Sequence, residues 1–225
     1  VFDPATGADQ GPKHRVPYPL HLGRQVSPER DADVLPDQDG VRNITPPANA
    51  PDQDDFDDGV QMSRIVLADC VVATFPVQIA IGPNLQAFLA QYGAGTTAYL
   101  NVWADGNRDG DWADVKQCNG QAAFEHLVID RPINLPALGP GLHVISVTTG
   151  LAYWPANLAD KPAWLRFTLS ERPSNKPFNQ GATQFGDGRG HALAFATGET
   201  EDRLWRARED AANGPDLAIR KRGAM

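Results

Sequence analysis

The sequence has no apolar run long enough to cross a membrane, and its longest, Val71–Ile81, is interrupted by Pro76. Basic residues are also in the minority, with 20 Lys and Arg against 28 Asp and Glu and a formal charge of −8. This balance argues against nucleic acid and anionic membrane surfaces, because both attract basic proteins. The sequence therefore predicts neither membrane insertion nor a nucleic-acid partner.

Signatures of catalysis and of transition-metal binding are lacking as well. The five histidines are scattered, with no H-x-H or H-E-x-x-H pair, so they do not predict a transition-metal site. There is no G-x-S-x-G elbow, no P-loop and no C-x-x-C motif. A glycosidase needs a pair of carboxyl groups, but no acid and base stand out among the many acidic residues. The sequence therefore predicts a protein that is not an enzyme.

Glycine and proline, by contrast, are abundant, with 21 and 19 residues. So many turn-forming residues suit an all-β fold better than a helical bundle. The candidate strands are Met62–Ala68, Val71–Ile81, Thr97–Ala104, Phe124–Asp130, Leu142–Thr149, Trp164–Ser170 and Ala192–Ala196. One short helix is predicted at Asn84–Tyr92, where apolar side chains fall on one side. The predicted fold class is all-β, an antiparallel β-sandwich of jelly-roll or immunoglobulin-like type.

Three regions of the chain differ in composition. Residues 1–50 are polar, rich in proline and aspartate and without sustained periodicity, which predicts an extended N-terminal arm lying over another part of the protein, or a partly disordered leader. Residues 51–205 contain the candidate strands and predict the sandwich, and residues 206–225 predict a short peripheral C-terminal tail. The chain begins at Val1 without a leader, so we expect a removed signal peptide or a trimmed chain, and an extracellular or cell-surface location.

Cysteine is scarce, with Cys70 and Cys118 the two in the chain. An even number of cysteines in a chain expected to be secreted predicts a disulfide between them, with two buried thiols as the alternative. Closing a loop of this length would stabilise the fold by roughly 3–4 kcal/mol in the chain-entropy model. The bridge would join the strand near Cys70 to the end of an acidic loop.

That loop, DGNRDGDWAD from Asp105 to Asp114, is the most informative segment of the sequence. Ca²⁺ takes six to eight oxygen ligands at about 2.3–2.6 Å, and a D-x-N-x-D-G loop can wrap around one such ion. The twelfth position is Lys116, so the glutamate that closes an EF-hand is missing. The alternative is a solvated turn rich in Asp and Asn. The predicted calcium ligands in this loop are Asp105, Asn107, Asp109, Asp111 and Asp114.

Two further acidic groups are candidate metal ligands. Asp55, Asp57 and Asp58 belong to a dense cluster whose charges would repel one another without a cation or an arginine between them. A solvated run of charges is the alternative for this cluster. Glu199 and Glu201 share one side of a predicted strand and could meet either the Asp105 loop or the Asp57 region. Their alternative is a salt bridge with an arginine.

The acidic DDFDDGV at 54–60 is followed by NVWADGNRDGDW at 101–112, a strand LRFTLS at 165–170, and GETED at 198–202. This order of motifs resembles the GEVED domain, a β-sandwich module of bacterial secreted and surface proteins. The resemblance covers roughly residues 22–205, with Thr200 in place of the usual valine. It implies a domain of large adhesin-like or matrix proteins, many of them calcium-stabilised, and no catalytic activity.

These features together predict a secreted, calcium-stabilised structural subunit of an extracellular fibre, surface layer or biofilm matrix. Such a subunit would assemble with copies of itself through its terminal arms, for example by adding a strand to an open sheet edge. The alternative is a carbohydrate-binding or adhesion module, in which Trp154 and Trp164 stack on a glycan. Burial of these two side chains in the core or at a subunit contact is the favoured interpretation.

Overall fold

Alternation of side chains between two faces organises the larger sheet. In β11 (Ala163–Ser170), Leu165, Phe167 and Leu169 point into the core, while the residues between them face the other way. The same period places Leu100 and Val102 of β6 (Thr97–Ala104) in the core. The computed structural model describes residues 2–3, 8–9, 12, 14–16, 18–26, 58–109, 112, 114–173 and 194–205.

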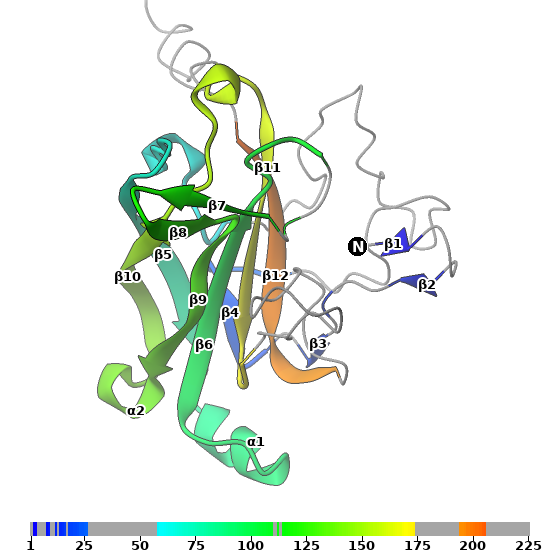
Figure 1. The fold of residues 1–225 in the computed structure, drawn as a ribbon. Coiled ribbons are helices and arrows are strands. Elements are labelled where there is room, and N and C mark those ends of the chain that lie inside the picture. Colours follow the sequence, from blue (N-terminus) through cyan, green and yellow to red (C-terminus); the bar gives the residue numbers. More distant parts are fainter. Residues whose placement is uncertain are drawn as a thin grey trace, which may run out of the picture.

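This larger sheet has five strands in the order β3-β12-β11-β6-β9 (Figure 1). The three remaining strands are β3 (His14–Val16), β9 (His126–Asn134) and β12 (Phe195–Trp205). All neighbours are antiparallel except β3 and β12, which run parallel. The second sheet has three antiparallel strands in the order β10-β5-β4, formed by β10 (Gly141–Leu151), β5 (Val72–Ile81) and β4 (Leu20–Leu22).

The core lies between the two sheets. Phe75 of β5 meets Phe167 of β11 edge to face, with ring centroids 6.2 Å apart. Val77 and Ile79 of the smaller sheet, and Leu100 of the larger one, are also fully buried in this layer. Two facing sheets with one shared apolar layer make a β-sandwich, so the predicted fold class is confirmed.

Short elements connect the strands. The hairpin β7 (Val115–Cys118) and β8 (Gln121–Phe124) turns through Asn119 and Gly120, which both have positive φ as a two-residue hairpin turn requires. The described α-helices are α1 (Leu85–Gln91) and α2 (Leu135–Leu138), and the 3-10 turns are η1 (Met62–Arg64) and η2 (Ala156–Leu158). Near the N-terminus, β1 (Phe2–Asp3) pairs with β2 (Ala8–Asp9). None of the helices described is long and apolar enough to cross a membrane.

One predicted strand was wrong. The expected strand Met62–Ala68 is instead the 3-10 turn η1 followed by irregular chain, although Ile65 and Leu67 are buried. Within the predicted N-terminal arm, the strands β3 and β4 join both sheets of the sandwich. Residues 27–50 of the predicted arm, residues 51–57 that follow it, and the predicted tail 206–225 lie outside the described residues.

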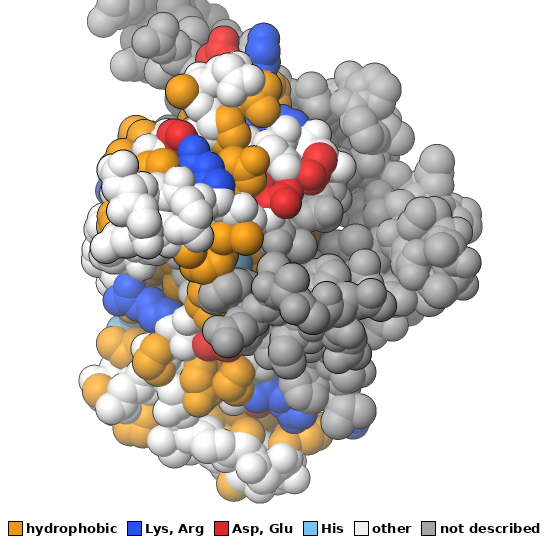
Figure 2. Space-filling view, in the orientation of Figure 1, with side chains coloured by type: hydrophobic (Ala, Val, Ile, Leu, Met, Phe, Trp, Pro, Cys, Tyr) orange, Lys and Arg blue, Asp and Glu red, His pale blue; other side chains and the backbone are white. Residues whose placement is uncertain are grey.

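The surface drawn in Figure 2 mixes residue types. Hydrophobic, charged and other polar side chains alternate over its described part, without one continuous apolar patch. A large apolar patch would mark this part of the surface as a binding site.

Candidate metal site

The acidic loop follows β6 and leads into the β7–β8 hairpin. At its start, the backbone N–H of Asp105 donates to the carbonyl of Trp164 (3.0 Å), which continues the pairing of β6 with β11. At its end, the N–H of Glu125 donates to the carbonyl of Asp114 (3.1 Å), which closes the base of the hairpin. The loop is therefore attached to the sheet on one side and to the hairpin on the other.

Three side chains of the loop converge on one another. Asn107 Nδ2 donates to Asp109 Oδ2 (2.7 Å) and to Asp114 Oδ2. The Asn107 Oδ1 atom accepts from the backbone N–H of Asp109 (3.1 Å). The two carboxylates thus meet at the amide nitrogen of Asn107, whereas its amide oxygen accepts from the backbone. Gly110 and Asp111, the remaining residues of the D-G-D segment, lie outside the described residues.

Glu125 holds the loop from inside, and sequence reasoning missed it. Its side chain is 0% exposed, and its Oε1 atom accepts from the N–H groups of Gly106 (2.7 Å) and Asn107 (3.2 Å). Its Oε2 atom accepts from the N–H of Asp114 (3.3 Å). Burial raises the pKa of Glu125 to about 8, these three hydrogen bonds lower it in part, and the nearby Asp105 raises it further. The one signal in the sequence is a single carboxylate within the largely apolar segment 122–128.

Arg108 ties the same loop to the segment that follows Trp154. It has a positive φ of 66°, and its guanidinium lies 4.1 Å from the centre of the Trp154 ring. Burial lowers the pKa of Arg108, against the effect of the nearby Asp105 and Glu125 carboxylates. Its N–H groups donate to the backbone carbonyls of Asp105, Gly106, Leu158, Lys161 and Pro162. A guanidinium with so many acceptors fixes the backbone of both segments.

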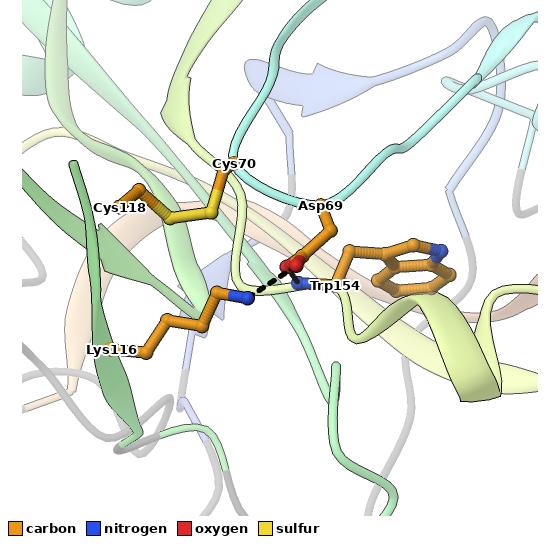
Figure 3. Close-up of a disulfide and its surroundings, with 5 residues drawn as sticks. All are labelled: Asp69, Cys70, Lys116, Cys118 and Trp154. Carbon is orange, nitrogen blue, oxygen red and sulfur yellow. Dashed lines mark hydrogen bonds and ion pairs between the residues drawn. A yellow bond between two sulfur atoms is a disulfide. The ribbon is translucent and has the colours of Figure 1, made fainter.

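A disulfide anchors the hairpin that begins at the end of the loop. Cys70 and Cys118 are bonded, with Cα atoms 5.5 Å apart, which confirms the predicted pairing (Figure 3). Beside the disulfide, Lys116 forms an ion pair with Asp69, and Asp69 Oδ1 accepts from the N–H of Trp154 (3.1 Å). The hairpin is therefore joined to the segment before β5 by one covalent and one ionic contact.

The glutamates of the GETED motif do not reach this loop. Glu199 lies opposite Leu169 of β11, whereas Asp105 is bonded to Trp164 at the other end of the same strand. Glu199 Oε2 accepts from the N–H of Leu22 (2.8 Å). Glu201 Oε1 accepts from the N–H of Gly59 (2.8 Å), so this residue meets the second of its two predicted neighbourhoods, the segment next to Asp57.

The acidic cluster before β5 is described only from Asp58 onward. Asp58 Oδ1 accepts from the N–H groups of Arg24 (2.6 Å) and Gln25 (3.4 Å), so this carboxylate caps a turn of the N-terminal segment. Asp55 and Asp57 lie outside the described residues. Asp202 of the GETED motif forms an ion pair with Arg166.

The two tryptophans proposed to stack on a glycan differ in exposure. Trp154 is 0% exposed and meets Trp205 edge to face, with ring centroids 5.0 Å apart. A side chain covered in this way cannot stack on a sugar, so the glycan-stacking prediction for Trp154 was wrong, and burial was the correct interpretation. Trp164 is half-buried, between Ala163 and Leu165 in β11.

The donor set fits a hard cation in kind. Carboxylate and amide oxygens are the ligands that Ca²⁺ prefers, and the carboxylates of Asp109 and Asp114 meet at the Asn107 side chain, whose amide nitrogen donates to both. The donor set is incomplete in number, because no group of three or more His, Cys, Asp or Glu side chains within the described residues is placed to hold a metal ion.

Comparison with protein-family models, with curated proteins and with solved structures finds no match for this chain.

Proposed function

We propose that this chain is a secreted, non-enzymatic structural subunit whose β-sandwich is stabilised by Ca²⁺ bound in the Asp105–Asp114 loop. The observation that carries the proposal is the convergence of Asn107, Asp109 and Asp114 on one point. These three side chains would hold the ion, and Ca²⁺ would neutralise carboxylates that otherwise repel each other. Glu125 and Arg108 would keep the loop backbone in place.

Two further observations support an extracellular structural role. The Cys70–Cys118 disulfide is typical of proteins that mature in an oxidising compartment. The motif segments behind the resemblance to the GEVED domain also meet in space, since Glu199 bonds Leu22 and Glu201 bonds Gly59. We therefore extend the proposal to membership of that family and to assembly into a fibre, surface layer or matrix. The glycan-binding alternative is weakened, because Trp154 is buried.

The calcium part of the proposal is tested by thermal unfolding in millimolar Ca²⁺ and after chelation. For the unmodified chain, we expect Ca²⁺ at 100 times its Kd to add about 2.7 kcal/mol to the free energy of unfolding. Asp109→Asn should abolish most of that gain. Asp160→Asn, the same change at an exposed aspartate outside the loop, should retain it. An identical response to Ca²⁺ in both variants would overturn the assignment of the ion to this loop.

The assembly part is tested by negative-stain imaging of the purified chain in the same two conditions. Ordered polymers in Ca²⁺ that come apart on chelation are the expected result. Isolated particles in both conditions would contradict the structural role, whatever the thermal unfolding shows.

A further inference from the structure

A short N-terminal segment, residues 14–25, completes the edges of both sheets. Its strand β3 pairs with β12, with His14 opposite Phe195 and Val16 opposite Thr197. Its strand β4 then pairs with β5 of the other sheet, with Leu22 opposite Ile79. Figure 1 shows these two strands in blue, with β4 beside β12. One segment of the chain thus covers one edge of each sheet, and we call it the donor segment.

The donor segment is held by apolar burial and by main-chain hydrogen bonds. Leu20 and Leu22 are both 0% exposed and belong to the core between the sheets. The carbonyl of Pro19 accepts from Gly82 N–H (2.7 Å), and Gly23 N–H donates to the carbonyl of Gln78 (2.8 Å). These contacts are the ones by which an added strand binds a sheet edge.

The rest of the sandwich forms a matching slot for this segment. Glu199 Oε2 accepts from the N–H of Leu22, although Glu199 is buried among core residues on the inner side of β12. Gly59 packs against Gly23, where a Cβ atom on either glycine would lie 2.8 Å or less from the other residue's backbone nitrogen. The N–H of Gly59 is fixed in turn by Glu201 (2.8 Å). We call this surface, made by Gly59, β5 and β12, the acceptor slot.

Donor and slot are separated in the sequence by residues 27–57. A chain of that length can span at most about 100 Å, so its length alone permits the donor segment to reach a neighbouring molecule. A second copy carries the same segment, and the contacts in the slot are the same whichever molecule supplies it. They are mainly apolar and main-chain contacts, so chains that each carry a charge of −8 need no complementary charged surfaces to exchange them.

We propose that the subunit assembles by strand exchange, with residues 14–25 of one copy inserted into the acceptor slot of the next. This inference rests on the proposed function, because it names the contact by which the structural subunit would polymerise. Its occupant is a second copy of this chain, and the residues that identify the contact are Leu20 and Leu22 on the donor and Ile79, Ile81 and Glu199 on the acceptor.

The exchange is tested with two full-length single variants, His21→Cys and Ala80→Cys, carrying different tags. Residues 21 and 80 are directly opposite each other in the β4–β5 ladder, on the face away from the core. Opposed Cα atoms of this kind are about 4.5–5.5 Å apart, within the range that a disulfide spans. The two variants are mixed, assembled in Ca²⁺ and mildly oxidised, and the products are separated without reductant.

Strand exchange predicts a covalent heterodimer that carries both tags in the assembled fraction and that neither variant forms alone. The double variant His21→Cys with Ala80→Cys is the geometric control, and in polymers it should give a ladder of covalently linked chains. Polymers whose double variant closes only within single chains would overturn the exchange and leave the proposed function standing. No polymers in Ca²⁺ would overturn both.

A second measurement uses the unmodified chain and so does not depend on how the cysteine variants fold. A synthetic peptide of residues 14–25, in excess during assembly, should occupy acceptor slots and shorten the polymers severalfold. The matched control peptide carries Leu20→Asp and Leu22→Asp, which cannot enter the core, and should leave the length unchanged. Equal polymer lengths with both peptides would contradict the exchange.

Discussion

Replacing Glu125 by glutamine isolates the effect of a buried charge on stability. Glutamine keeps an oxygen that can accept from Gly106 and Asn107, as Oε1 does in the unmodified protein. It removes the ionisable group, which is 0% exposed and whose pKa burial raises from 4.5 to about 8. Any difference in pH dependence between Glu125→Gln and the unmodified protein therefore reports the titration of this carboxyl group together with its coupling to Asp105.

The sign and size of the effect follow from linkage. Between pH 4.5 and pH 8 the folded protein binds a proton at Glu125 more strongly than the unfolded chain does, so the free energy of unfolding falls as the pH rises. The contribution is fully present below pH 4.5 and is lost as the pH rises through 8. A shift from 4.5 to about 8 corresponds to about 5 kcal/mol. The variant should therefore gain about 5 kcal/mol over the unmodified protein between pH 4.5 and pH 9.

The assay is denaturant unfolding of both proteins at several pH values, in chelator so that no cation compensates the charge. Groups that do not interact with Glu125 titrate equally in the two proteins and cancel in the difference. Glu171→Gln is the matched control, since Glu171 is also buried and accepts from Ala196 N–H (2.9 Å), but it forms an ion pair with Arg172. That variant should lose stability at neutral pH. Parallel curves for Glu125→Gln and the unmodified protein would refute the argument from burial.

Two further changes test single structural features. Replacing Cys70 and Cys118 together by serine opens a loop with a sequence separation of 48. The chain-entropy model gives a loss of about 4 kcal/mol in the free energy of unfolding, which denaturant unfolding measures, and an unchanged midpoint would contradict this prediction. Gly198→Ala should cost at least about 3 kcal/mol, because φ is +122° and the added Cβ would lie 2.0 Å from the Leu169 carbonyl oxygen. Gly95→Ala, which meets nothing within 4 Å, should leave the melting temperature nearly unchanged, and equal losses in the two alanine variants would disprove the steric argument.

Features that depend on short-range sequence pattern could be predicted well. The expected strand Thr97–Ala104 matches β6, and Trp164–Ser170 is one residue shorter than β11. In both strands each second side chain enters one core, so the local alternation carries the whole signal. The convergence of Asn107 with Asp109 and Asp114 is likewise local, because the three residues belong to one loop.

Features that depend on contacts between distant segments could not be predicted. The run Leu20-His21-Leu22 is too short for its alternation to predict a strand within a polar region. These residues are buried because they pair with β5 and contact Glu199 of β12, both distant in the sequence. Glu125 lies 18 residues or more beyond two of its hydrogen-bond donors, and the sequence does not show which loop a buried carboxylate will hold. Glu199 and Glu201 alternate as expected for a strand, but the identity of their partners depends on how the sheets pack.

The acidic loop and the disulfide are connected through the β7–β8 hairpin. The β7–β8 hairpin lies between Asp114 and Glu125, which are joined at its base by a backbone hydrogen bond. Its other end carries Cys118, which the disulfide joins to Cys70. The disulfide therefore limits how far the base of the hairpin can move, and with it the Asp114 carboxylate that meets Asn107. Coupled contacts of this kind are not additive, so removal of the disulfide should also weaken the stabilisation that we attribute to Ca²⁺.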